Sequence, residues 1–391
     1  MCLKKKVFYN MVIPPPHRKA LCIGLQQDKG NTKPIDILLP HTYNENKRKE
    51  VVYLRKQYVH GIAYGFVHFS VEVACFYFLY SRISTTPLFW ALALLFDAVA
   101  FLPQGLFGML TDRFPRLNIG LIGALCMLVA FPIPNDLIGL LFLASGNAMV
   151  HVSGAQHTLR DTHGKIGPNS IFVGGGSFGV VTGQLLGSLS NPVLAMIPLL
   201  LMLLSCVIII WVHQRNDLSG RFATFRITAP KSMEFLVICA VLAVTVRGYI
   251  AYAIPTEWNK SVPQTVALFV CMGIGKTLGG ILCDRLGYGK VTYLSLLVGL
   301  PFLLGGNSNM ALSLIGIALF SMTMPVTVAI LVSVFPKQPG FAFGLTTLGL
   351  FLGVAPAFFI RPETLLAHQI VVVILTAMAL PAVLLCIKKG K

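Results

Sequence analysis

The sequence predicts an all-α polytopic membrane protein with about twelve transmembrane helices, arranged as two pseudo-symmetric six-helix bundles. Composition is the first reason: 55% of the 391 residues are hydrophobic and only 12% are charged, whereas soluble domains average about 25% charged residues. Long apolar windows recur along most of the chain, and a short charged motif occurs twice at equivalent places. A chain with so little polar surface requires lipid as its main solvent.

Apolar windows of about 20 residues mark the individual spans. We expect them near 58–80, 87–110, 117–131, 137–158, 166–189, 192–212, 233–254, 262–282, 291–304, 310–335, 340–359 and 366–387. The spans divide the chain into a basic arm (1–57), which we expect to be cytoplasmic and mostly disordered, a first bundle (58–213), a cytoplasmic linker (214–231) and a second bundle (232–391).

The net charge of +17 reports membrane topology. Of the 31 Lys and Arg residues, only Arg82, Lys260 and Arg361 fall on the face opposite the termini, and Arg247 and Lys276 fall within spans. This asymmetry follows the positive-inside rule and predicts that both termini are cytoplasmic. We therefore expect anionic lipid, and not nucleic acid, as the partner of the basic arm.

Cysteine usage and residue spacing give no sign of catalysis. The nine cysteines include no C-x-x-C pair, so we expect no disulfide framework, no metal site and no cofactor. No nucleophile–base cluster occurs at a catalytic spacing, which argues against an enzyme.

One loop motif follows both the second and the eighth span. The first copy reads Gly108-Met-Leu-Thr-Asp112-Arg113-Phe-Pro-Arg116, and the second reads Gly280-Ile-Leu-Cys-Asp284-Arg285-Leu-Gly-Tyr-Gly-Lys290. Lys165 and Lys337, which open the fifth and eleventh spans, are separated by the same number of residues as the two Asp-Arg pairs. Two matches at one offset indicate a duplicated six-helix unit.

This repeated loop resembles the hallmark of the major facilitator superfamily, and the resemblance covers roughly residues 58–388. Within that superfamily, His68-x-x-x-Glu72, His151-Val-Ser-Gly-Ala and the glycine-rich stretch 170–179 are similar to the fosmidomycin-resistance type of exporter. The resemblance implies secondary active transport by alternating access, with the first and seventh spans lining a central cavity.

The charged residues of the two loops are the candidates for gating: Asp112, Arg113, Arg116, Asp284, Arg285 and Lys290. Such charges pair across helices in one conformation and separate in another, which would latch the cytoplasmic side. The alternative is that they are ordinary positive-inside flanks.

Four ionisable residues lie within spans, where a charge costs at least about 2.5–3.5 kcal/mol. Glu72 and Asp97 are candidates for proton coupling, and Arg247 and Lys276 for a substrate cavity. We expect Glu72 and Arg247 to pair or compete across that cavity. The alternatives are a static ion pair, and for Lys276 a long side chain that reaches the membrane surface.

His68 and His151 complete the predicted substrate cavity. His68 precedes Glu72 by one helical turn and therefore shares its face, while His151 is placed there by the family resemblance. Two histidines with Arg247 and Lys276 suit a solute with anionic or polar groups. Simple hydrogen bonding to a neighbouring helix is the alternative for each histidine.

The fifth span carries a glycine at every fourth position, namely Gly175, Gly179, Gly183 and Gly187. The ladder leaves one helix face without side chains, so a neighbouring helix can approach closely. Such a face would serve either bundle rocking during transport or static packing.

These observations predict a multi-pass transporter of the plasma membrane (the inner membrane in a Gram-negative cell). An ion gradient, most simply protons, would drive it, and the subgroup resemblance favours export. Proton-coupled import of a polar or anionic nutrient is the first alternative. A receptor that keeps the fold without moving solute is the second.

Overall fold

The computed structural model describes residues 9–10, 22–23 and 39–388, except 161, 190, 216–217, 219–221 and 254–256. The chain forms two units, residues 1–51 and 52–391. In the first unit, β1 (Tyr9–Asn10) pairs antiparallel with β2 (Cys22–Ile23). Helix α1 begins at Leu39, within the arm that we expected to be disordered. The rest of that arm lies outside the described residues.

The remaining elements are all helical. The first half holds α1 (Leu39–Phe78) with a π-helical end (Leu79–Ile83), α2 (Phe89–Phe101), α3 (Gln104–Arg113), α4 (Ile119–Ala130), α5 (Asp136–Leu159), α6 (Gly167–Ser188), a 3₁₀ turn (Pro192–Ala195) and α7 (Met196–Arg215). The second half holds α8 (Met233–Ala253), α9 (Val262–Leu286), α10 (Tyr288–Thr292), a π-helical segment (Tyr293–Val298), α11 (Gly299–Gly305), α12 (Met310–Ser321), α13 (Thr323–Val334), α14 (Pro339–Ala357) and α15 (Leu365–Cys386).

The predicted spans are confirmed as helices. In the described part of the chain, 11 helices are long and apolar enough to cross a membrane, and the shorter apolar helix Ile119–Ala130 occupies the place of the third predicted span. Two spans are interrupted beside a proline: α2 and α3 meet at Pro103, and α12 gives way to α13 just before Pro325. Proline lacks the N–H that would continue the helical ladder, which accounts for both breaks.

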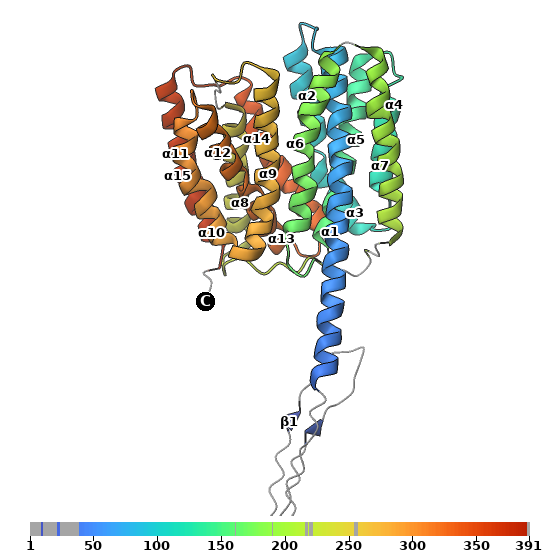
Figure 1. Ribbon diagram of the computed structural model, residues 1–391, viewed down its shortest axis with the longest axis vertical. Coiled ribbons are helices and arrows are strands. Elements are labelled where there is room, and N and C mark those ends of the chain that lie inside the picture. The colour runs from blue at the N-terminus through green and yellow to red at the C-terminus, as the bar shows by residue number, and fades with distance from the viewer. Residues whose placement is uncertain are drawn as a thin grey trace, which may run out of the picture. The chain divides into compact units, whose positions relative to one another are not determined.

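Two groups of helices make up the unit 52–391, as Figure 1 shows: α1–α7, coloured blue to green, and α8–α15, coloured yellow to red. The most apolar 18-residue window of Val193–Arg215 has a mean hydropathy of 3.0, and only 22% of that window is buried inside the protein. The corresponding share for Met310–Val334 is 83%. Because an apolar face this exposed is incompatible with water, the outer helices face lipid.

Glycines permit the two bundles to touch along two seams. A Cβ added to Gly108 on α3 would overlap the backbone of Gly340 on α14, and one added to Gly174 on α6 would overlap Thr277 on α9. The two seams are related by the repeat. Helices α3 and α9 carry the two copies of the Asp-Arg motif, and α6 and α14 follow the equivalent residues Lys165 and Lys337. Close backbone contact of this kind replaces side-chain interdigitation in membrane interiors.

Candidate functional site

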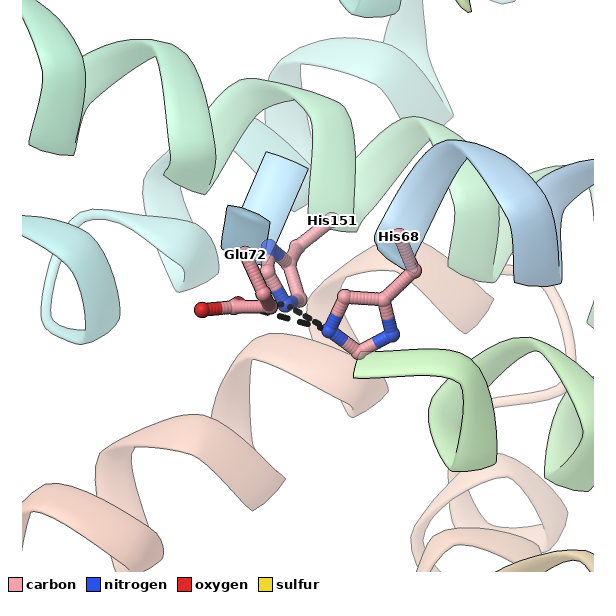
Figure 2. Close-up of side chains that lie close together, drawn as sticks. All are labelled: His68, Glu72 and His151. Atoms are coloured by element: carbon pink, nitrogen blue, oxygen red, sulfur yellow. Dashed lines mark hydrogen bonds and ion pairs between the residues drawn. The ribbon is translucent and has the colours of Figure 1, made fainter. Parts of the chain in front are cut away.

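Three ionisable side chains converge in the first bundle. His68 and Glu72 come from successive turns of α1, and His151 comes from α5 (Figure 2). The His68 and His151 Nε2 atoms are 2.8 Å apart, and each lies 3.5 Å from Glu72 Oε1. The side chains are 8%, 8% and 11% exposed respectively for His68, His151 and Glu72. Groups this buried need their charges compensated within the protein.

The hydrogen bonds of the two rings determine which nitrogen carries a proton. His68 Nδ1 lies 2.9 Å from the Phe172 carbonyl oxygen, and His151 Nδ1 lies 2.9 Å from the Asn147 carbonyl oxygen. A carbonyl only accepts hydrogen bonds, so each Nδ1 must be the donor. In two neutral rings both Nε2 atoms would then present lone pairs to each other. The 2.8 Å contact therefore requires a cation between the rings, such as a shared proton.

Asn147 supports this cluster from α5. Its Nδ2 donates to Glu72 Oε1 and lies at the same distance, 3.3 Å, from Cys75 Sγ. Its own backbone carbonyl accepts from His151. One residue thus orients both the carboxylate and one imidazole, as supporting residues around ligating or titrating groups commonly do.

Phe172 connects the cluster to the second bundle. Its ring centroid lies 5.0 Å from that of His68 and 6.2 Å from that of His151, and 6.1 Å from the ring of Phe343 on α14. Gly176, one turn further along α6, leaves the space that His68 occupies, because a Cβ there would overlap the imidazole. The cluster therefore lies one aromatic side chain from the opposite bundle.

The other predicted cavity residues do not join this cluster. Lys276 Nζ donates to Ser177 Oγ at 2.9 Å, across the α6–α9 seam. Asp97 is buried, and neither a hydrogen bond nor an ion pair links it to another described residue. Arg247 Nη1 is buried without a hydrogen-bond partner among the described residues. Glu72 contacts the histidines, so the expected Glu72–Arg247 ion pair is not formed in this structure.

The repeated loops form a reciprocal pair of contacts between bundles, which we term the latch. Asp112 accepts hydrogen bonds from the backbone N–H groups of Gly340 (3.2 Å) and Phe341 (2.9 Å), in the first turn of α14. Asp284 accepts from the backbone N–H groups of Ile166 and Gly167, both at 2.9 Å, at the start of α6. Each carboxylate thus caps a helix of the opposite bundle, where free N–H groups and the helix dipole favour a negative charge.

The cations of the two loops do not take part in the latch. Arg113 and Arg285 are exposed, as are Arg116 and Lys290, and the described residues show no ion pair between them and Asp112 or Asp284. The gating contacts therefore depend on the carboxylates, whereas we expected the charges of both signs to pair. The exposed cations remain typical positive-inside flanks.

Arg160 is a member of the latch that the sequence did not reveal. Its Nη2 donates to Asp112 Oδ1 at 3.0 Å, with both side chains almost fully buried, and Gln156 Nε2 donates to the same oxygen at 3.2 Å. In the sequence Arg160 is one of many basic residues near a span end. The sequence does carry a signal for the backbone partners of the two aspartates. Pro168 and Pro339 mark the N-termini of α6 and α14, whose first N–H groups the aspartates bind.

The glycine ladder of α6 faces α1 of the same bundle. A Cβ added to Gly175, Gly179, Gly183 or Gly187 would overlap the backbone or a Cβ atom of α1, from Gly65 to Tyr80. The ladder therefore holds α6 against the helix that carries His68 and Glu72. The α6–α9 seam uses other glycines of the same helix.

Sequence comparison adds no family assignment, because no family model and no curated protein matches the chain. Solved structures do match. The outward conformation of the transporter FucP of the major facilitator superfamily gives a TM-score of 0.55 at 12% identity, covering 83% of this chain and 100% of that chain.

Two further solved structures share the architecture. A bacterial homologue of the iron transporter ferroportin in an outward-facing state gives a TM-score of 0.51 at 14% identity, covering 84% of this chain and 98% of that chain. The human organic anion transporter MFSD10 gives 0.57 at 14% identity, covering 84% and 99%. At these identities the likeness concerns the fold, and the similarity to the fosmidomycin-resistance type stays a prediction. The chain has the fold of major facilitator superfamily transporters.

Proposed function

We propose that the chain is a secondary active transporter that moves a small solute by alternating access between its two bundles. The observation that carries this proposal is the latch, in which Asp112 and Asp284 each cap the first turn of a helix in the opposite bundle. These bonds cross between bundles and leave the internal helix bonds of each bundle untouched. They are therefore contacts that can open without unfolding either half.

The latch closes the end of the molecule that we assign to the cytoplasm. Hydrogen bonds to a charged acceptor contribute about 1.5–3 kcal/mol each, so the stability of the closed state rests on a few separate bonds that solute binding can offset. Two of the similar solved structures are described as outward-facing, which agrees with closure at the cytoplasmic end. Multi-pass insertion in the plasma membrane with both termini cytoplasmic completes this assignment.

Proton coupling is the driving force that we propose. Glu72 lies beside a histidine pair whose contact needs a cation, and that cation is most simply a proton. Asp97 is a second buried carboxyl group without a hydrogen-bond partner among the described residues. A proton taken up by this group of residues changes the charge next to Phe172 and the bundle interface. Solute and proton would thereby be linked through the same contacts.

The solute and the direction depend on the site and not on the fold. Proteins of similar structure include a fucose:proton symporter, a homologue of an iron transporter and an organic anion transporter, whose solutes are chemically unrelated. Arg247 and Lys276 favour anionic or polar groups on the side of the second bundle. Export is favoured over import by the resemblance to the fosmidomycin-resistance type alone.

The test is proton flux in proteoliposomes that contain the purified full chain, screened against phosphonates, organic anions, sugars, drugs and divalent metal ions. A solute-dependent proton signal supports a coupled transporter, and its sign distinguishes export from import. Solute-dependent flux without proton movement would refute proton coupling. Binding of a solute without any flux, in folded protein, would favour the receptor alternative.

A further inference from the structure

The cluster of His68, Glu72 and His151 has the composition of a metal site. Among the residues described with side chains, these three form the one group of three or more histidine, cysteine or carboxylate residues whose ligand atoms all lie within 4.8 Å of one another. Two imidazoles and one carboxylate form the ligand set that proteins use for zinc and for non-haem iron. From the absence of a C-x-x-C pair we expected no metal site. The three residues escaped that argument because ligands on separate helices leave no local spacing signal.

The three ligand atoms lie close to the spacing that one ion requires, although the two Nε2 atoms must move apart by about 0.5 Å for tetrahedral coordination. The three atoms that face one another form a triangle with sides of 2.8, 3.5 and 3.5 Å. A point about 2 Å from all three atoms lies within about 1 Å of their plane, which matches metal–nitrogen and metal–oxygen bonds for zinc. We therefore propose that His68, Glu72 and His151 bind a divalent transition-metal ion of the Zn²⁺, Co²⁺ or Fe²⁺ type.

The surrounding hydrogen bonds prepare the histidines for a metal. Metal-bound histidines usually donate their other ring N–H to a carbonyl or carboxylate, which fixes the tautomer and the ring orientation. Here both Nδ1 atoms are bonded to backbone carbonyls, of Phe172 and Asn147, so both Nε2 atoms keep a free lone pair beside Glu72 Oε1. Asn147 also bonds to Glu72. Every ligand thus has an orienting partner.

Nearby charges restrict which ion can bind. Lys276 supplies a positive charge on α9, where its Nζ donates to Ser177 Oγ, and Ser177 directly follows Gly176, which packs against the His68 ring. An ammonium group opposes a bound divalent cation, so binding must come from coordination by imidazole nitrogen more than from net charge. Mg²⁺ and Ca²⁺, which prefer oxygen ligands, are therefore excluded.

The position of the cluster gives the ion its role. It lies beside Phe172, one side chain from the second bundle, and three protein ligands leave further coordination positions open. We take the metal ion as the solute itself, in place of the anionic or polar solute that Arg247 and Lys276 alone would favour, and this second step rests on the transport function proposed above. Binding in detergent tests the site, and flux in liposomes tests the step.

The binding experiment uses the full chain, purified in detergent and stripped with a chelator. Zn²⁺ is titrated by calorimetry and Co²⁺ by visible absorption, in the wild type and in His68→Gln, Glu72→Gln and His151→Gln. His368→Gln is the matched control, since His368 is a buried histidine of α15 outside the cluster. We expect one site per chain, at least about tenfold weaker in each cluster variant, and unchanged in His368→Gln and in excess Mg²⁺.

The contrary results are equally defined. No binding by the wild type, or binding that survives all three cluster variants, overturns the site. Where a variant fails to fold, the wild-type Co²⁺ spectrum decides: nitrogen and oxygen ligation supports the site, and a thiolate charge-transfer band, which would implicate a cysteine such as Cys75, overturns it.

Uptake of Zn²⁺ into liposomes that enclose a fluorescent chelator completes the test. Zn²⁺ flux that is lost in His151→Gln but not in His368→Gln supports the metal ion as solute. Binding without flux, in vesicles that transport another solute, overturns the solute assignment while the transport proposal stands. Flux of another solute without any Zn²⁺ binding overturns the metal site alone.

Discussion

The latch and the His68–Glu72–His151 cluster differ in symmetry. The latch occurs twice, since each bundle supplies one aspartate and one helix N-terminus to the other. The cluster occurs once, in the first bundle, while the second bundle has the buried Arg247 and places Lys276 against α6. The repeat is therefore visible in the contacts that we propose to open and not in the cluster that we propose to bind an ion. In the proposed mechanism, opening involves both halves, whereas ion recognition involves the first bundle.

The largest expected effect is at the cluster. Glu72→Gln keeps the shape of the side chain but removes its charge, so solute-dependent proton flux should fall to the level of empty liposomes. Asp97→Asn should retain measurable flux, because Asp97 contacts neither histidine. Flux in Glu72→Gln at the wild-type level, in protein with unchanged thermal stability, would transfer the coupling role to Asp97.

The next effect is at the latch. Asp112→Asn and Asp284→Asn each remove a charged acceptor from a helix N-terminus, so each should destabilise the closed state by about 1.5–3 kcal/mol per bond lost. Asp112→Asn should destabilise the closed state more than Asp284→Asn does, because it also removes the ion pair with Arg160. The measurement is the rate at which a chemical label reacts with a reporter group placed near the latch, because opening of the latch exposes that group.

Asp136→Asn is the control for this pair. Asp136 pairs with Arg82 at 2.6 Å, its side chain is 41% exposed, and it begins α5 at the end remote from the latch. Its loss should leave labelling at the latch unchanged. Equal acceleration in all three variants would mean general destabilisation and would refute a specific latch.

A smaller effect is expected at the glycine that makes room for His68. Gly176→Ala places a methyl group against the imidazole and should cost about 1–3 kcal/mol of stability through overpacking. Gly105→Ala, where nothing lies within 4 Å of the added Cβ, should be close to neutral. Thermal unfolding in detergent measures both, and equal stability in the two variants would contradict the packing of His68.

The smallest effect should come from the exposed cations of the repeated loops. Arg113→Ala and Arg285→Ala should change latch opening by less than about 0.5 kcal/mol, as is usual for surface substitutions. The same labelling assay applies. An effect as large as that of Asp112→Asn would restore these arginines to the gating role that the sequence suggested.

The sequence predicted helices well because lipid imposes a simple rule. Apolar windows give the number and order of the spans, and the one window without a long helix, α4, was among the shortest. The repeat also identified Asp112 and Asp284. It did not identify their partners, because a backbone N–H carries no side-chain signature and the contact crosses between bundles.

The cluster likewise combines a feature that local sequence predicts with contacts between distant segments that it does not. The spacing of His68 and Glu72 placed them on one face of α1, which is a local inference. The meeting of both rings at one point depends on how α5 packs against α1, and on the Phe172 and Asn147 carbonyls that fix the tautomers. The expected Glu72–Arg247 pair was a long-range prediction, and in the structure Glu72 contacts the two histidines instead.

The most direct test of the central claim is a distance across the latch. Spin labels introduced as non-natural amino acids at Arg116 and Lys337, both exposed, report the separation of the two bundles in liposomes. We predict one short distance in the wild type and an added longer population in the Asp112→Asn, Asp284→Asn double variant. A single unchanged distance in the folded double variant would show that these carboxylates do not hold the bundles together, and would contradict the account.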